Sequence, residues 1–281
     1  MDKATSISGG KTSAYLAVNY PSEHNWFALV TTDDESCAFT DPACVEYVQT
    51  KTDAEVVGTL EDDAIVYTIM DLEQYMGRTI DIVLGDTFET VIDKRGSYLP
   101  NVMTRYCTTE MKIRPLFRHW SATCDEPIEM QIGFRANEGR RAQNMLNKTN
   151  DDGLSEFKDI VGQHPSGRNK WATTAWQKPT FPLIADGIFK DTIEQFWNDK
   201  PVRFAALNNC VGCFHRNPVL LRQMWDVHPH KMDWFAAQEG RDKGGQWKKE
   251  MPYSVIKQHK SQFELDLSEW ESDCDSGHCG L

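Results

Sequence analysis

A glycine pair between an apolar segment and a helix-like segment constrains the fold of this chain more than any other feature. The short run Ala4–Ser8 predicts a strand, and Thr12–Tyr20 carries apolar side chains at helical spacing. Gly9 and Gly10 lie between them and predict a tight turn from strand to helix. The residues of this turn are Ser8, Gly9, Gly10, Lys11, Thr12 and Ser13. Such a turn is typical of α/β proteins that bind phosphate at the start of the helix.

Alternating strand and helix signals continue along the chain. Further strands are predicted at Trp26–Thr31, Ala64–Met70 and Ile128–Phe134. One helix is predicted to begin after the N-cap Asp41, and another to cover Asp191–Trp197. This order favours a Rossmann-like α/β fold, with a parallel sheet and helices on both faces.

The expected organisation is a nucleotide-binding α/β domain at residues 1–190 and a smaller, mostly helical region at 191–281 with a cysteine site. The polar stretch Asn147–Lys178 is predicted to be a loop or a mobile flap between them. Gln262–Leu281 contains six acidic residues and no Lys or Arg. That composition predicts a poorly ordered acidic tail, unless its two cysteines hold it in place.

Charge and hydropathy exclude several classes of protein. The chain of 281 residues has a net charge of −12, which argues against a protein that simply coats nucleic acid. Basic residues nevertheless outnumber acidic ones in 91–148, which indicates either a local anion site or a solvated basic face. No apolar run approaches the roughly 18–20 residues of a membrane span. The few residues before Ser8 leave no space for a secretory signal, so we expect a cytoplasmic protein without membrane contact.

Eight cysteines are present, and reduced thiols are expected in that compartment. Cys210 and Cys213 form a C-x₂-C knuckle that can bring two thiolates onto one metal, with Gly212 relieving crowding. Thiolates suit both iron–sulfur clusters and zinc, and a redox dithiol or inert buried thiols are further possibilities.

Five sequence blocks lie in order along residues 4–220: Ser8–Ser13, Val30–Asp33 with Asp41-Pro42, Arg105–Pro115, Ile132–Arg141, and Phe181–Ile184 with Asn209–Phe214. Together they resemble the phosphoadenosine phosphosulfate (PAPS) reductase-like group of the adenine nucleotide α-hydrolase superfamily of PP-loop ATP pyrophosphatases. The chain is especially similar to the phage and DNA-phosphorothioation-type branch. The glycine loop matches Ser-Gly-Gly-x-x-Ser at every fixed position, whereas a Walker A loop would need a glycine at Thr5. Gly139 replaces the serine that is usual in the fourth block.

The resemblance implies that the loop holds ATP, with Mg²⁺ on its phosphates, while Lys11 and Arg135 neutralise developing charge. Outside the loop, the residues implied to contact the nucleotide are Thr32, Asp33, Gly133 and Arg135. Those expected to hold a second anionic group are Lys112, Arg114 and Arg141.

The resemblance also adds Cys107 to the knuckle and implies a [4Fe–4S] cluster, with zinc as the alternative. We take Cys274 as the fourth ligand, while Cys279, His215, a substrate sulfur or no protein group are the other options.

The resulting functional hypothesis is a sulfurtransferase that works by adenylation. ATP is split to AMP and pyrophosphate to activate an oxygen of an unidentified acceptor, either a small molecule or a nucleic acid, and a sulfur or nitrogen nucleophile displaces AMP. A second hypothesis is reduction of PAPS or its unphosphorylated analogue to sulfite, with Cys279 as the nucleophile. The intact loop argues against it, because PAPS reductases lack this loop. A third hypothesis is a non-catalytic nucleotide-binding accessory protein with a structural metal site.

Overall fold

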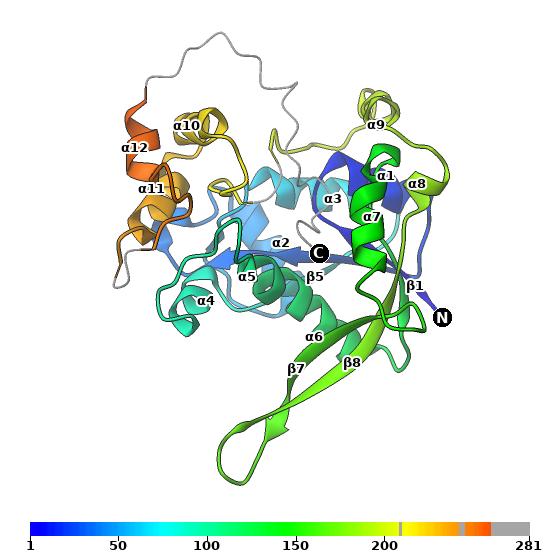
Figure 1. The fold of residues 1–281 in the computed structure, drawn as a ribbon. Helices are drawn as coiled ribbons and strands as arrows, with labels where there is room; N and C mark the ends of the chain where they lie inside the picture. Colours follow the sequence, from blue (N-terminus) through cyan, green and yellow to red (C-terminus); the bar gives the residue numbers. More distant parts are fainter. Residues whose placement is uncertain (208–209, 242–244, 260–281) are drawn as a thin grey trace.

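A six-stranded sheet forms the centre of the protein (Figure 1). The computed structural model describes residues 1–207, 210–241 and 245–259. The strands are β1 (Lys3–Ile7), β2 (His24–Leu29), β5 (Asp81–Leu84), β6 (Ile128–Gln131), β7 (Ser155–Gln163) and β8 (Asn169–Thr180). Their order is β5-β2-β1-β6-β8-β7; the first five are parallel, and β7 runs antiparallel to β8. The Rossmann-like α/β class predicted from the sequence is therefore confirmed.

Helices cover both faces of this sheet because successive strand side chains point to opposite sides. In β2, Phe27 and Leu29 belong to one core and Trp26 and Ala28 to another. The helices in the Phe27 core are α1 (Lys11–Asn19), α2 (Pro42–Thr52), α3 (Ala64–Met76) and α9 (Lys190–Trp197). Those in the Trp26 core are α6 (Arg114–Thr123) and α7 (Gly139–Leu146).

The C-terminal part is mostly helical and packs at the end of β2. Its helices are α10 (Pro218–Val227), α11 (Pro229–Gln238) and α12 (Tyr253–Gln258). They share a third core with α4 (Phe88–Lys94). This core includes Trp234, Trp247 and Tyr253 and extends to Val30, the residue after β2. The remaining elements are the antiparallel pair β3 (Thr31–Thr32) and β4 (Gly58–Thr59), α5 (Tyr106–Thr108), a π-helical segment at Thr109–Ile113, α8 (Pro182–Ala185), and 3₁₀ turns at Glu35–Cys37 and Ala136–Glu138.

The strand predicted at Ala64–Met70 is wrong, because this segment is the first half of helix α3. Its buried residues include Ile65, Ile69 and Leu72, which recur every three or four residues as on one face of a helix. The third strand is instead the short β5, which comes after Gly77 ends α3 in the left-handed conformation.

The loop predicted at Asn147–Lys178 is also wrong, because most of this stretch forms the hairpin of β7 and β8. Ile160, Val161, Trp171 and Thr173 are strand-forming residues, but polar neighbours surround them because both faces of the outer hairpin meet solvent. Its polar composition therefore reflects exposure and not the absence of regular structure.

The other predicted elements are confirmed within a few residues. The Asp41 carboxylate accepts a hydrogen bond of 2.8 Å from the Ala43 N–H, so it caps α2 as expected. β6 ends at Gln131, three residues before the predicted end. Among the described residues, none of the helices combines the length and the apolar character that a membrane span requires. The predicted acidic tail, including Cys274 and Cys279, lies outside the described residues.

Candidate functional site

The candidate site lies at the carboxyl ends of the parallel strands. β1 is flanked by β2 on one side and by β6 on the other. The sheet therefore grows from β1 toward β5 on the first side and toward β8 and β7 on the second. In open α/β sheets the ligand crevice lies outside the carboxyl ends of the strands at such a switch point. The segments that leave β1 and β6 here are Ser8–Gly10 and 132–135.

These two segments touch each other. A Cβ added to Gly133 would lie 3.4 Å from both the Ser13 Cα and the Thr12 Cγ2 atoms. Gly133 therefore packs directly on the first turn of α1. The structure thus brings the predicted loop and Gly133 together.

The glycine loop is held by its own serines. The Ser8 N–H donates to the Ser13 Oγ at 3.0 Å, and the Ser13 hydroxyl donates to the Gly10 carbonyl at 3.1 Å. Gly9 has a φ of +77°, and a Cβ there would lie 2.5 Å from the Cγ2 of Ile65 on α3. Gly10 precedes the helix with extended backbone and has no side chain to cap it. The start of α1 therefore offers backbone N–H groups and its positive dipole end to an anion.

Lys11 lies in the first turn of α1 and is half-exposed. Its ammonium group forms an ion pair with Glu194 of α9. The indole N–H of Trp197, one turn further along α9, donates to the Lys11 carbonyl at 3.0 Å. Helix α9 therefore borders the loop and fixes the position of Lys11.

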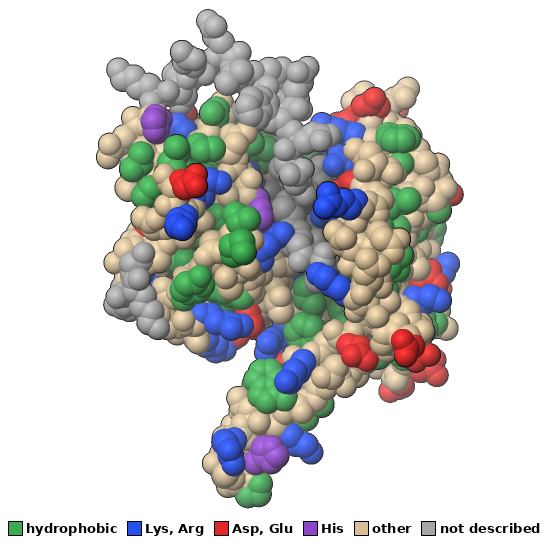
Figure 2. Space-filling model, viewed as in Figure 1, with side chains coloured by type: hydrophobic (Ala, Val, Ile, Leu, Met, Phe, Trp, Pro, Cys, Tyr) green, Lys and Arg blue, Asp and Glu red, His purple; other side chains and the backbone are tan. Residues whose placement is uncertain are grey.

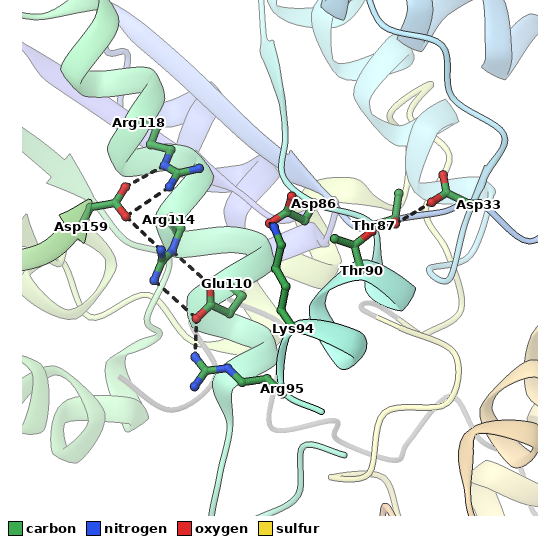
Figure 3. Close-up of polar contacts among 10 residues, drawn as sticks. All are labelled: Asp33, Asp86, Thr87, Thr90, Lys94, Arg95, Glu110, Arg114, Arg118 and Asp159. Carbon is green, nitrogen blue, oxygen red and sulfur yellow. Dashed lines mark hydrogen bonds and ion pairs between the residues drawn. The ribbon is translucent and has the colours of Figure 1, made fainter. Parts of the chain in front are cut away.

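Thr32 and Asp33 follow β2 and face the segment that follows β5. The Thr32 hydroxyl donates to Glu89. Asp33 accepts a hydrogen bond of 2.7 Å from the Thr87 hydroxyl (Figure 3). Thr32 is buried, whereas Asp33 is exposed. These contacts join the ends of two neighbouring strands and leave the Asp33 carboxylate accessible from solvent.

Arg135 follows β6 and is buried with Glu138. Glu138 accepts from the Arg135 backbone N–H at 2.8 Å and from its Nε at 3.2 Å, and its other oxygen binds Arg141. The Arg141 guanidinium also lies over the Phe134 ring, 4.5 Å from the centroid. One carboxylate thus holds two of the predicted anion-binding arginines beside the Gly133 segment.

Arg114 lies in a different network, on α6. It contacts Asp159 of β7 at 2.9 Å and Glu110 at 3.1 Å, while Arg118 and Arg95 bind the same two carboxylates (Figure 3). It also lines a surface hollow of about 600 Å³ beside β5. Within the described residues, Arg114 is thus engaged by carboxylates and is not brought to the glycine loop.

Lys112 lies beside a fully buried carboxylate. Its ammonium group is 2.9 Å from the Glu61 Oε1, and Glu61 also accepts from the Val30 N–H at 3.4 Å. Burial by itself would lower the pKa of Lys112, but Glu61 and then Cys210 hold it above its usual value. The pair therefore connects the end of β2 to the cysteine knuckle.

The knuckle itself is built onto this strand end. The Val211 N–H donates to the Leu60 carbonyl at 2.9 Å, and Cys210 forms a β-bridge with Glu61. A Cβ on Gly212 would lie 2.3 Å from the Phe235 ring, and the Tyr253 hydroxyl donates to the Gly212 carbonyl at 2.8 Å. The C-terminal helices thus press the knuckle against the sheet.

Cys213 lies close enough to Cys107 and Cys210 to influence the ionisation of both thiols. Burial, and then the neighbouring Cys213, raise the pKa of the Cys107 thiol to about 11. Burial, and then Glu61, raise the pKa of Cys210 well above its ordinary value, while Lys112 opposes the rise. All three cysteines are free thiols in this structure.

Cationic side chains surround these thiols. Burial lowers the pKa of Arg105, while Cys213 and then Cys107 act to raise it. Burial likewise lowers the pKa of Arg216, while Cys213 and then Cys210 act to raise it. Burial also lowers the pKa of Lys248, and Cys213 acts to raise it. Within the described residues, the Nε atom of Arg105 is buried without a hydrogen-bond partner. The region is therefore suited to a group that carries negative charge among the sulfurs.

Two metal groups are predicted for these thiols, a [4Fe–4S] cluster and zinc. Three thiolates around one zinc ion, with Zn–S bonds of about 2.3 Å, must lie within about 4 Å of one another. Among the described residues, no three Cys, His, Asp or Glu side chains are arranged to hold an ion. The predicted fourth ligand Cys274 lies outside the described residues.

Sequence reasoning missed four residues of this region: Glu61, Arg105, Arg216 and Lys248. Arg105 and Arg216 lie within two or three residues of Cys107 and Cys213, so their spacing was an available signal. Glu61 belongs to a run of three acidic residues that resembles an ordinary solvated surface. No local pattern marks Lys248.

The chain matches none of the protein-family models with which it was compared. A comparison with curated proteins likewise finds no match to its sequence.

Proposed function

We propose that the protein is a PP-loop enzyme of the PAPS reductase-like type that adenylates an acceptor and then transfers sulfur to it. The observation that supports this most strongly is the pairing of two strand ends at the switch point. Gly133 after β6 packs on the first turn of α1, and that turn follows a left-handed Gly9. This is an arrangement in which a triphosphate can approach the backbone closely.

Loop residues would act on the departing pyrophosphate. N–H groups at the start of α1 bind the oxygens of the pyrophosphate. When ATP enters, the Lys11 ammonium group leaves its ion pair with Glu194 and binds a phosphate oxygen instead. Arg135, held by Glu138, is positioned after β6 to stabilise charge on the phosphates. Mg²⁺ supplies further charge neutralisation on the phosphate oxygens.

Thr32 and Asp33 are proposed to contact the nucleoside. They follow the strand next to the loop strand, and the exposed Asp33 carboxylate can accept a hydrogen bond from a ribose hydroxyl or an amine. Arg141 then serves a second anionic group, while Lys112 belongs with the thiols. Arg114 is left out of this proposal because two carboxylates already bind it.

The proposed reaction has two steps. An acceptor oxygen attacks the α-phosphorus of ATP, its bond to the bridging oxygen breaks, and pyrophosphate leaves. A sulfide nucleophile then attacks the acceptor atom that carries this oxygen, forms a bond to sulfur and displaces AMP, which leaves with the oxygen. No net oxidation or reduction occurs when the nucleophile is hydrosulfide.

Cys107, Cys210 and Cys213 are proposed to hold a [4Fe–4S] cluster, which would supply a site for sulfur. Arg105, Lys112, Arg216 and Lys248 would offset the negative charge of the ligating thiolates. Because the knuckle pairs with Glu61, which binds the backbone after β2, the cysteines lie at the same sheet edge as the loop.

Product analysis tests the proposed function. ATP labelled at the α-phosphate is incubated with hydrosulfide and, in separate reactions, duplex DNA, transfer RNA or small nucleophiles. We expect AMP and pyrophosphate in equal amounts, with turnover lowered about 100-fold by Lys11→Ala. Glu194→Ala removes only the partner of Lys11 and is the matched control, for which turnover is retained.

Three outcomes would contradict the proposal. ADP and phosphate as products would mean that the loop does not bind a departing pyrophosphate. Sulfite formed from PAPS would favour the reductase hypothesis. Tight ATP binding without turnover on any acceptor would favour a non-catalytic accessory protein.

A further inference from the structure

The β7–β8 hairpin extends beyond the body of the protein as an arm. Residues 160–171, which form its outer part, are all exposed. Figure 1 shows the hairpin projecting away from the helical layers. The register pairs Gln177 with Ile128 at the start of β6, so the earlier residues of β8 extend past the amino end of that strand. The arm therefore points away from the sheet edge that carries the glycine loop.

This arm is basic on a strongly acidic protein. Residues 160–171 contain Arg168, Lys170 and His164 and no Asp or Glu, although the chain carries −12. Figure 2 shows Lys and Arg side chains at the far end of the arm. At its base, the carboxylate of Asp159 is neutralised by two arginines, Arg114 and Arg118. Among the described residues, Arg168 and Lys170 form no ion pair.

The cations lie on both faces of the ribbon. Lys158 lies over the Trp171 ring, 6.0 Å from its centroid, so these two side chains share a face. Lys170 precedes Trp171 in the same strand and so points to the opposite face. Arg168 lies where the turn ends, since its carbonyl accepts from the His164 N–H at 2.8 Å. A flat anionic surface would meet only one of these faces.

We propose that the β7–β8 arm binds duplex DNA by entering the major groove. That groove is about 12 Å wide and about 8.5 Å deep, admits a two-stranded ribbon, and has phosphate backbones on both walls. Four outer residues of a strand span about 13 Å, which exceeds the groove depth. The exposed Trp171 and Val161 add apolar contact area. The narrow major groove of double-stranded RNA does not admit such an arm.

The experiment measures binding of the full-length protein to a fluorescent 20-base-pair duplex DNA without ATP, between 50 and 200 mM salt. The double variant Arg168→Ala with Lys170→Ala should weaken binding at least tenfold. It should also reduce the slope of log affinity against log salt by about 2, because each lost phosphate contact removes about 0.9. Trp171→Ala should weaken binding with little change in slope.

A matched control removes two exposed lysines outside the arm, Lys148→Ala with Lys249→Ala, and gives the same net charge. We expect less than a twofold change for this control and unchanged melting temperatures for both double variants. ATP binding should also be unchanged in the arm variant, which separates this inference from the proposed function.

Several results would overturn the inference. These are no binding to duplex DNA at 50 mM salt, equal losses for the arm and control variants, or tighter binding to single-stranded DNA or double-stranded RNA. Self-association through the exposed edge of β7, removed by Val161→Lys and not affected by DNA, would assign the arm to protein–protein contact instead.

Discussion

At the scale of single residues, glycines determine whether the candidate site can form. Gly9 must have a positive φ and must also leave space for Ile65, while Gly212 must leave space for the Phe235 ring. The glycine pair was recognisable in the sequence because it separates a strand from a helix. Its contact with Ile65 was not, because Ile65 belongs to the segment Ala64–Met70, which was predicted to be a strand.

Gly9→Ala should reduce the free energy of unfolding by about 2–4 kcal/mol. The left-handed backbone costs about 1–2 kcal/mol for a residue with a Cβ, and the contact with Ile65 adds an overpacking cost. Gly77→Ala is the matched control, because Gly77 has a φ of +62° with no atom within 4 Å of an added Cβ. Urea denaturation of both variants measures the difference. Equal losses would mean that Ile65 does not crowd Gly9.

At the scale of elements, short-range pattern predicted helices α1, α2 and α9 well. It failed where a segment is almost uniformly apolar or exposed on both faces. Ala64–Met70 is almost entirely apolar, so its helical period became visible only with Leu72 and the Gly77 cap. The prediction for the β7–β8 hairpin failed for the opposite reason. Both faces of its outer part are exposed, so it lacks the alternation of apolar and polar residues that usually identifies a strand.

The cysteine knuckle is an element with a direct chemical test. After anaerobic purification we expect a brown protein with about four iron and four sulfide per chain. Cys210→Ser should lose the iron, because Cys210, which forms a β-bridge with Glu61, is one of the proposed cluster ligands. Cys124→Ser, at the end of α6, is the matched control and should retain it. A colourless, zinc-containing protein, or full iron content in Cys210→Ser, would contradict the cluster.

At the scale of the whole molecule, the sheet topology explains how residues far apart in sequence reach one edge. The order of the strands places the segments after β1 and β6 side by side, and the C-terminal helices carry the knuckle to the end of β2. The sequence predicted the sheet class and the loop. It could not predict that Lys112 and Arg114, two residues apart, lie in different networks, because the π-helical segment and tertiary carboxylates separate them.

Calorimetric titration of Mg²⁺–ATP measures whether ATP binds at the glycine loop. Gly10 has extended backbone and precedes α1, where Asp and Asn are both favoured N-caps. Gly10→Asp should therefore keep or raise the melting temperature while lowering ATP affinity at least 100-fold, because a carboxylate would repel the phosphates. Gly10→Asn, similar in size and neutral, should lose much less. Equal ATP affinity in the wild type and Gly10→Asp would contradict the account.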